Sequence, residues 1–278
     1  MTDRHSPPAR HVHAVDVVRV AAGARERLRD VAAAEEPLEI RLHGSRFVVT
    51  MRTPGADREL AAGFLLSERL IGSGDDLAAI RHCTDAGADG NVLDVTLAGP
   101  AAARVEAALA GRRAVVTTSA CGVCGRQSID DLMRDVPQIV ADWSMTAAAV
   151  GTLPARLRAS QSVFDETGGL HAAGLFDRDG TLVGIAEDVG RHNAVDKAVG
   201  SQLLRDQFPL SDRALFVSGR TSFEIIQKAA VAGIPIVAAV SAPSSLAIDL
   251  ARAANVTLLG FVRGETFNIY TGEARIRS

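Results

Sequence analysis

Cysteine and aromatic residues are scarce in this 278-residue chain, and neither sign of charge is in strong excess. Three cysteines cannot build a disulfide framework, and so low a number suits a reducing compartment. A net charge of −3 gives no general attraction for nucleic acid or an anionic membrane surface. The longest apolar run, residues 229–240, is too short to cross a bilayer and contains Pro235. Residues 1–19 also lack the apolar stretch of a signal peptide. These absences predict a cytoplasmic protein without affinity for nucleic acid or membranes.

Two of the three cysteines, Cys121 and Cys124, are separated by only two residues. The β-branched run at residues 113–118 predicts a strand before them, and apolar spacing at residues 126–136 predicts a helix after them. A helix N-terminus and the positive charge of Arg126 both favour the thiolate, which is the nucleophilic form of cysteine. The two thiols are therefore predicted to lie on a reactive loop between a strand and a helix.

A CxxC pair alone fits three functions: half a zinc site, a dithiol redox switch or a sulfur carrier. A zinc deaminase has H-x-E before a P-C-x-x-C segment, whereas here His171 follows the cysteines without that glutamate, and no proline precedes Cys121. Strand–CxxC–helix is also the local pattern of thioredoxin-like proteins, so the residues leave dithiol exchange open. The remaining interpretation is that Cys121 and Cys124 are small packed residues without a chemical function. The third cysteine, Cys83, has no cysteine or metal-spaced partner and is expected to be a packed residue.

The apolar patterns predict two α/β units, in a chain of 47% apolar and 23% charged residues. Residues 1–13 are polar and are predicted to be a disordered tail, residues 14–112 an N-terminal α/β domain, and residues 113–278 a larger C-terminal domain. In the first, strands are expected at residues 15–20, 37–43, 46–52 and 91–97, and helices at 59–71 and 101–109. In the second, we expect an interrupted helix at 145–161, a loop at 164–169, a hairpin at 170–187, and helices and strands alternating from 193 to 270. Alternation of short apolar strands with helices indicates a sheet covered on both faces.

Hydroxyl-rich segments follow two successive strands of the second unit, at residues 218–222 and 241–245. Free N–H groups and hydroxyls at a helix N-terminus suit a phosphate, although serine is also an ordinary N-cap. Because the first segment contains Arg220 and ligands collect at such strand ends, we expect an anionic ligand there. Farther along, Phe261 could stack on a base and Arg263 could meet a phosphate, or both could belong to a surface turn.

A third strand-to-helix junction carries Asp188, Arg191 and His192. Asp188 and Arg191 are expected to form an ion pair. A helix start disfavours a charged imidazole, so His192 is expected to stay neutral and act as a hydrogen-bond partner. The residues leave structural and ligand-binding roles of this junction open.

Several ordered stretches together are far more specific than one CxxC pair. They are residues 51–60 (MRTPGADREL), 119–125 (SACGVCG), 169–174 (GLHAAG), 187–194 (EDVGRHNA) with Asp196-Lys197, 218–220 (SGR), 233–235 (GIP), 241–243 (SAP) and 268–271 (NIYT). From about residue 15 to its end, the chain resembles the FdhD/NarQ family of sulfur carrier proteins needed for formate dehydrogenase activity.

This resemblance implies a sulfurtransferase function. Members take sulfur from an IscS-type cysteine desulfurase and pass it to the molybdenum cofactor, bis-molybdopterin guanine dinucleotide, before its insertion into formate dehydrogenase. The family's persulfide cysteine matches Cys121, with Cys124 beside it. Its cofactor-contact segment matches Phe261, Val262, Arg263, Gly264, Glu265 and Thr266, to which we add Arg220 and His192. The resemblance further implies a homodimer, no metal bound directly by the protein, and a three-layer C-terminal domain like the cytidine deaminase fold without its zinc. A dithiol oxidoreductase and a non-catalytic cofactor chaperone remain the alternatives.

Overall fold

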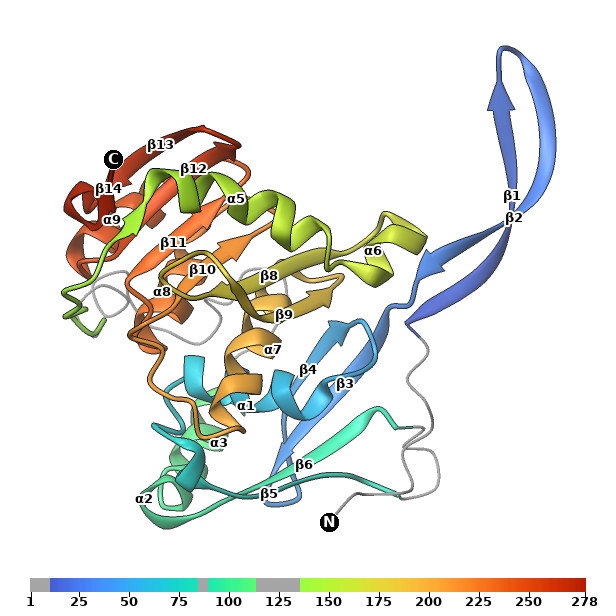
Figure 1. Ribbon diagram of the computed structural model, residues 1–278. Coiled ribbons are helices and arrows are strands. Elements are labelled where there is room, and N and C mark those ends of the chain that lie inside the picture. Colours follow the sequence, from blue (N-terminus) through green and yellow to red (C-terminus); the bar gives the residue numbers. More distant parts are fainter. Residues whose placement is uncertain (1–10, 85–89, 114–135) are drawn as a thin grey trace.

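The computed structural model of the chain describes residues 11–84, 90–113 and 136–278 (Figure 1). It is a mixed α/β fold with a four-stranded sheet near the N-terminus and a six-stranded sheet near the C-terminus. Helices lie between the two sheets, and a long two-stranded ribbon extends away from both of them (Figure 1).

The first two strands form this ribbon, which we call the arm: β1 (Val12–Ala21) pairs antiparallel with β2 (Ala24–Ala33). The turn residues Ala22 and Gly23 both have positive φ, as a two-residue hairpin turn requires. The sequence predicted only one strand here and a tail ending at residue 13, whereas β1 begins at Val12. The second strand was missed because its arginine- and alanine-rich sequence has low β propensity.

The four-stranded sheet has the order β4-β3-β6-β5, with β3 and β6 parallel. Its strands are β3 (Glu36–Leu42), β4 (Ser45–Arg52), β5 (Leu77–His82) and β6 (Val92–Leu97). Its helical elements are α1 (Asp57–Ser67), the 3₁₀ turn η1 (Gly74–Asp76), α2 (Gly99–Ala102) and α3 (Val105–Arg113). The predicted hairpin at residues 37–52 is confirmed. The helix expected at residues 101–109 is instead two helices, and β5 was not predicted.

The six-stranded sheet has the order β13-β12-β11-β10-β8-β9. Its strands are β8 (His171–Phe176), β9 (Leu182–Asp188), β10 (Ala214–Val217), β11 (Ile236–Ala239), β12 (Thr257–Arg263) and β13 (Thr266–Thr271). The strands β10, β11 and β12 are mutually parallel, while β8 and β13 run antiparallel to their neighbours. A short parallel pair, β7 (Met145–Thr146) and β14 (Ile276–Arg277), lies apart from it.

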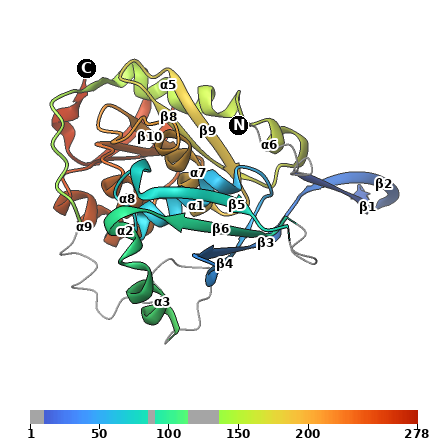
Figure 2. The same cartoon turned by 90° about the horizontal axis from the view of Figure 1, so that it is seen from below.

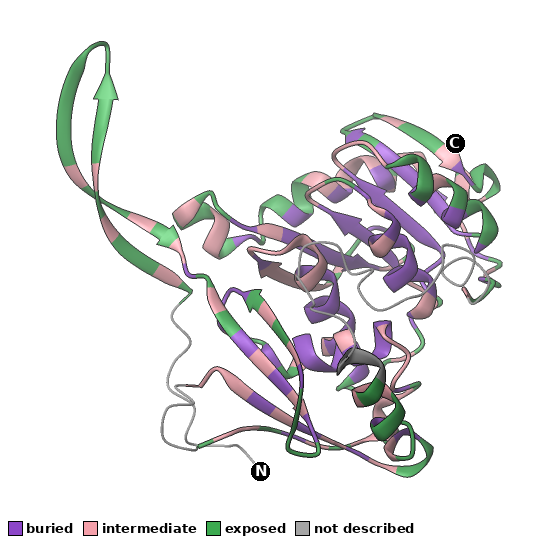
Figure 3. Ribbon diagram, turned by 180° about the vertical axis from the view of Figure 1, so that it is seen from behind, coloured by how far each residue is buried: buried purple, intermediate pink, exposed green. Residues whose placement is uncertain are grey.

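Helices cover both faces of this sheet, as the alternating pattern predicted (Figures 1 and 2). These helices are α5 (Ala147–Arg158), α6 (Ser162–Thr167), α7 (Arg191–Leu203), α8 (Phe223–Val231) and α9 (Ser245–Ala253), followed by the 3₁₀ turn η2 (Glu273–Arg275). Buried side chains of α5 pack with Phe176 and Phe216 on one face, and those of α7, α8 and α9 pack with Leu215 and Val237 on the other. The strands β8, β10 and β11 of this sheet are largely buried, whereas the edge strand β13 is partly exposed (Figure 3).

Two local predictions in this half of the chain were wrong. The helix α5 continues through Gly151 and Pro154, because its buried side chains fix it against the sheet and Gly151 lets the backbone carbonyl of Gly264 approach closely. Residues 164–169 were expected to be a loop, but α6 covers most of them. The carboxylate of Glu187 accepts hydrogen bonds from the N–H groups of Val163 and Phe164 at 3.1 and 2.9 Å. A helix start stabilised by so distant a residue cannot be seen in the local sequence.

One hydrophobic core spans both sheets, and a second buried cluster lies on the other face of the six-stranded sheet. The central contact, which we call the seam, is formed by α1 and α7. A Cβ atom at Gly63 would lie 2.0 Å from the carbonyl oxygen of Asp196, and one at Gly200 would lie 1.9 Å from that of Glu59. The seam thus depends on glycine, because the two helices approach backbone to backbone. The predicted domain boundary at residues 112–113 coincides with the end of α3 and stays a prediction.

Candidate functional site

The cysteine loop, with Cys121 and Cys124, the strand expected before it and the helix expected after it, lies outside the described residues. Its flanks are described. On one side, α3 ends at Arg113. On the other side, the N–H of Ile139 donates to the carbonyl of Ala254 at 2.9 Å, immediately after α9. The segment that carries both thiols therefore connects a helix of the N-terminal unit with the end of α9 in the C-terminal unit.

Three loops lie side by side at the carboxyl edge of the parallel strands β10, β11 and β12. The N–H of Thr221 donates to the carbonyl of Ala242 at 3.3 Å, and that of Ser244 donates to the carbonyl of Thr221 at 3.0 Å. The N–H of Phe261 donates to the carbonyl of Ser241 at 3.2 Å. Because neighbouring strands are about 4.8 Å apart, the first and third loops are separated by roughly 10 Å. The sequence predicted ligand-binding residues in all three loops, and the fold brings these loops to one edge.

The two serine-rich helix starts at this edge differ. Ser244 caps α9, since its Oγ accepts from the N–H of Ala247 at 3.3 Å. Ser222 occupies the equivalent position before α8 but makes no such capping bond. Its Oγ lies 3.1 Å from Nε2 of His192 instead. Ordinary capping thus accounts for Ser244 but not for Ser222, whose helix start keeps its N–H groups available for an anion.

His192 belongs to a chain of polar contacts that continues into the protein interior. Its Nδ1 lies 3.0 Å from a carboxylate oxygen of Glu224, whose other oxygen lies 3.4 Å from Nζ of Lys228. Lys228 also donates to both carboxylate oxygens of Asp196, at 2.9 and 2.8 Å. Asp196 further accepts from the hydroxyl of Ser67 at 2.8 Å. One end of this chain lies at the strand-end loops and the other in the seam.

Within this chain, Lys228 and Glu224 stabilise each other's charged forms. Burial alone would lower the pKa of Lys228, but the carboxylates of Asp196 and Glu224 raise it above its usual range, so the amine stays protonated. Burial would raise the pKa of Glu224, but its hydrogen bond with His192 and the charge of Lys228 lower it below its usual value. Glu224 is therefore an anion that orients His192 toward Ser222.

A second histidine, His171, lies at the start of β8 beside the loop after β10. A Cβ atom at Gly219 would lie 3.3 Å from Nδ1 of this ring, so the glycine makes room for it. Burial, followed by the positive charge of Arg191, lowers the pKa of His171. Nε of Arg191 and the hydroxyl of Thr221 are buried without a hydrogen-bond partner among the described residues. This part of the edge thus combines positive charge with unused hydrogen-bonding groups.

The six residues expected to contact the cofactor span the end of β12, the two-residue turn after it and the first residue of β13. Phe261 is 39% exposed and has a left-handed backbone (φ 54°), which is strained for a bulky residue. Arg263 and Glu265 are exposed, as are Gly264 and Thr266. The side chain of Val262 is only 1% exposed and packs in the core next to α5, so only its backbone is available to a ligand. Arg220, in the first loop, is also exposed.

The junction at residues 187–193 is mainly structural. Asp188 was expected to pair with Arg191, but its carboxylate lies 2.7 Å from Nζ of the buried Lys197. The same carboxylate accepts from the N–H of Thr53 at 3.1 Å, and Asn193 donates to the carbonyl of Met51 at 2.7 Å. These contacts connect residues 51–53, at and just after the end of β4, to the C-terminal unit.

Sequence reasoning noted Asp196 only as part of the family resemblance, and it missed Lys228 and Ser67. One signal was available: Glu224 and Lys228 are spaced i, i+4 in an otherwise apolar helix, where a lysine must find a partner. Cys83 is half-buried with a free thiol. Within residues 11–84, 90–113 and 136–278, no three metal-binding side chains gather in one place. No helix in those segments is long and apolar enough to cross a bilayer.

Together, these features describe a mixed α/β protein with exposed arginines and hydroxyl groups at one sheet edge and a CxxC pair elsewhere in its sequence. The chain belongs to the FdhD/NarQ family, whose model matches residues 33–277. It is 50% identical over 268 residues to a protein from Nocardia farcinica described as sulfur carrier protein FdhD, covering 94% of each chain. The resemblance seen in the sequence is therefore confirmed.

Known structures agree with this assignment. A crystal structure of a protein from Desulfotalea psychrophila, provisionally assigned as a formate dehydrogenase accessory protein, has a TM-score of 0.76 and 25% identity. The match covers 96% of this chain and 100% of that one. A guanine deaminase from Nitrosomonas europaea matches 53% of this chain with a TM-score of only 0.30. The deaminase-like fold of the C-terminal domain therefore stays a prediction.

Proposed function

We propose that this protein is a cytoplasmic sulfur carrier that accepts sulfur on Cys121 and passes it to the molybdenum cofactor before the cofactor enters formate dehydrogenase. The observation that carries the proposal is 50% identity, over nearly the whole chain, with a protein described as a sulfur carrier. The partners are a cysteine desulfurase of the IscS type, formate dehydrogenase and a second copy of the chain. The acceptor is bis-molybdopterin guanine dinucleotide, bound as a substrate.

Sulfur loading requires a nucleophilic thiolate. The Cys121 thiolate attacks the outer sulfur of the desulfurase persulfide, a new S–S bond forms on Cys121, and the desulfurase cysteine leaves as a thiolate. No external oxidant is needed, because one persulfide replaces another. Arg126, on the same loop, would favour the thiolate form of Cys121. Cys124, the second thiol of the CxxC pair, would assist release of the sulfur.

The strand-end loops provide the surface for the acceptor. Its pyrophosphates suit the start of α8, where Ser222 is not engaged in capping, and the exposed guanidinium groups of Arg220 and Arg263. Phe261 offers an exposed ring face for a guanine base. His192, oriented by Glu224, would donate or accept one hydrogen bond at the same edge. The other residues of the predicted contact turn would contribute mainly backbone groups.

Intact mass after incubation with a cysteine desulfurase and cysteine tests sulfur loading. We expect one added sulfur on the wild type and none on Cys121→Ala, with Cys83→Ala as the matched control that loads normally. Stoichiometric loading of Cys121→Ala, together with its loss in Cys124→Ala, would show that the persulfide forms on Cys124 instead.

Calorimetry with GDP tests the ligand surface. Removing the arginine that meets a phosphate should cost about 1.5–3 kcal/mol, so the Kd of Arg263→Ala should rise at least tenfold. Arg252→Ala, an exposed arginine on α9, is the control and should bind as the wild type does. Equal affinities for wild type and Arg263→Ala would remove Arg263 from the site, and no binding to the wild type would refute the surface.

A non-catalytic cofactor chaperone is the second candidate, because none of the three strand-end loops contains a cysteine. Formate oxidation in a strain lacking the native protein separates the two. A sulfur carrier with both Cys121 and Cys124 replaced by alanine should bind GDP yet fail to restore formate oxidation, whereas a chaperone would restore it. A dithiol oxidoreductase would instead form a Cys121–Cys124 disulfide and carry no sulfur adduct, which the intact mass also detects.

A further inference from the structure

The arm is the least supported part of the described fold. Its two strands pair only with each other among the described strands, so each keeps an open hydrogen-bonding edge. Ten residue pairs at about 3.4 Å give it a length of roughly 30 Å, and it points away from the body (Figure 1). An isolated two-stranded ribbon is at best marginally stable in water. Open edges on such a ribbon also invite pairing with another chain.

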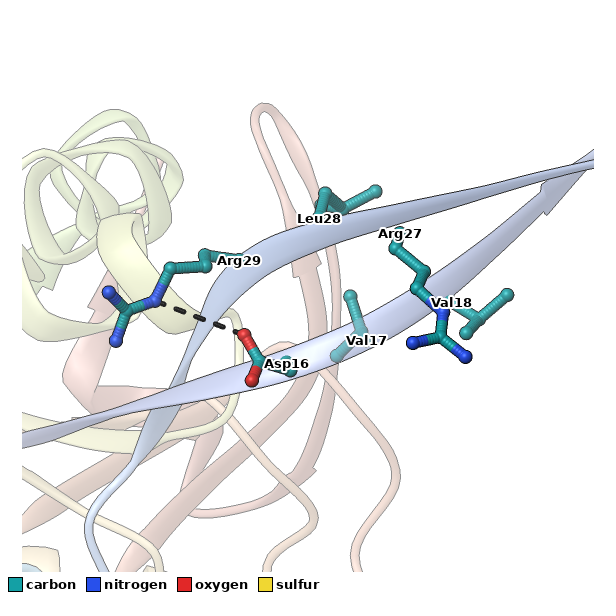
Figure 4. Close-up of a pocket in the computed structure, with 6 residues that line it drawn as sticks. All are labelled: Asp16, Val17, Val18, Arg27, Leu28 and Arg29. Carbon is teal, nitrogen blue, oxygen red and sulfur yellow. Dashed lines mark ion pairs between the residues drawn. The ribbon is translucent and has the colours of Figure 1, made fainter.

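Apolar side chains are exposed toward the tip of the arm. Val18 is 54% exposed and Val20 is 63% exposed, both on β1. Their cross-strand partners are Arg27 and Arg25, so valines and arginines share one face of the ribbon. Figure 4 shows the middle of the arm, where the twisted ribbon is hollowed by about 480 Å³ between these strands. This combination of apolar and charged groups is typical of a surface that meets a partner.

Charge is distributed unevenly along the arm. Near the tip, Arg19, Arg25 and Arg27 outnumber the single acidic residue, Glu26. Acidic side chains gather at the other end, where α6 contacts β2 and Gly169 lies against Ala33. We call the exposed residues Asp30, Glu35 and Glu166 the acidic collar; the neighbouring Asp165 forms an ion pair with Arg158. The molecule thus presents a basic tip and an acidic collar at opposite ends of one exposed ribbon.

We propose that the arm is a dimerisation element, in which the basic tip of one protomer meets the acidic collar of a second copy of the chain. In an antiparallel two-fold arrangement the basic tip of each protomer contacts the acidic collar of the other. The same contact therefore occurs twice, and the interface is self-complementary. The exposed valines of the two arms then cover one another at the centre. This assigns a surface to the homodimer of the proposed function, on which it rests, and it adds no role in sulfur chemistry.

A second copy fits the arm better than a polyanion does. A nucleic acid would be attracted by the arginines but repelled by the acidic collar, and it would leave the valines uncovered. A second copy satisfies both charged ends and the apolar stretch with residues already in the chain. Because the tip and collar are exposed, their attraction is screened by salt, with a Debye length of about 10 Å at 0.1 M.

Charge reversal tests this proposal on the full-length protein by analytical ultracentrifugation. The wild type should sediment at twice the 29.1 kDa chain mass. Arg25→Glu/Arg27→Glu reverses the tip and Glu35→Lys/Glu166→Lys reverses the collar, and each variant alone should raise the dimer Kd at least tenfold. An equimolar mixture of the two should dimerise again, because each tip then meets a collar of opposite charge.

Two controls keep this result specific. Arg205→Glu/Arg252→Glu makes the same charge change on exposed residues of the C-terminal unit and should leave the dimer unchanged. Circular dichroism should show the same secondary structure in every variant, and unaltered melting at concentrations low enough to keep the wild type monomeric. The proposal would be overturned if the wild type were a monomer, if the reversed variants dimerised with the wild-type Kd, or if their mixture stayed monomeric. It would also be overturned if the monomer bound RNA through the arm. Persulfide loading of Cys121, measured separately, shows whether sulfur transfer fails independently of the dimer.

Discussion

The seam and the arm place similar ion pairs in opposite surroundings. Next to the seam, Lys228 and Asp196 are 4% and 2% exposed, and their charged groups lie 2.8 Å apart. In the arm, Arg29 and Asp16 are 80% and 92% exposed and lie 3.9 Å apart. Water screens the arm pair and leaves its side chains mobile. In the buried pair, removal of either partner leaves an uncompensated charge and lowers the free energy of unfolding. Charges near the seam therefore determine stability, and charges on the arm are available to a partner.

Removing the buried cation should produce the largest effect. Lys228→Met leaves the carboxylate of Asp196 buried and uncompensated, so the free energy of unfolding should fall by about 3–5 kcal/mol. Urea denaturation measures this. The double variant Lys228→Met/Asp196→Leu removes both charges and should recover much of the loss, because the hydroxyl of Ser67 keeps the carbonyl of Gly63 as an acceptor. A loss below about 1 kcal/mol in the single variant would show that the pair is not as buried as described.

Crowding the seam should produce the next effect. In a helix interior, alanine is normally more favourable than glycine by about 1 kcal/mol. At Gly200 the sign should reverse, because the new Cβ would lie 1.9 Å from the carbonyl oxygen of Glu59, and we expect a loss of about 3 kcal/mol. Gly23→Ala in the arm turn is the matched control: its φ of 84° adds strain, but nothing lies within 4 Å. Equal melting curves for Gly200→Ala and wild type would refute the close approach of α1 and α7.

The contrast also explains what could be predicted from the sequence. The hairpin at residues 37–52 and the alternating elements from residue 193 onward follow local patterns, and they were predicted correctly. Two buried ion pairs could not be predicted in this way: Asp188–Lys197 and Lys228–Asp196. They lie where segments distant in sequence meet, so no local spacing identifies them. At the site, strand-end chemistry pointed to the three loops. The different roles of Ser222 and Ser244 depend on where His192 lies, which only the fold reveals.

Acid should expose the contribution of Glu224, which links the strand-end loops to the seam. Its pKa is lowered in the folded protein, so its stabilisation is present above its ordinary value of 4.5 and is lost as pH falls through the lower folded value. Glu224→Gln should therefore lose about 1–2 kcal/mol at pH 6, with a shallower decline of unfolding free energy below pH 4.5. Denaturation curves of both proteins between pH 3 and 6 measure the difference. Parallel curves would mean that Glu224 titrates alike in the folded and unfolded states.

Substitutions in the arm should have the smallest effect on stability, because its side chains are exposed. Such substitutions should therefore separate effects on stability from effects on dimerisation most clearly. Val18→Ser/Val20→Ser replaces two exposed side chains, so at protein concentrations low enough to keep the chain monomeric the free energy of unfolding should change by less than about 0.5 kcal/mol. If these valines cover one another in a dimer, the same variant should raise the dimer Kd, since burying each apolar side chain contributes roughly 1 kcal/mol or more. Chemical denaturation and sedimentation of one preparation compare the two quantities directly. A large loss of monomer stability would place the arm with the seam as a structural element, and an unchanged Kd would mean that the valines do not meet a second copy.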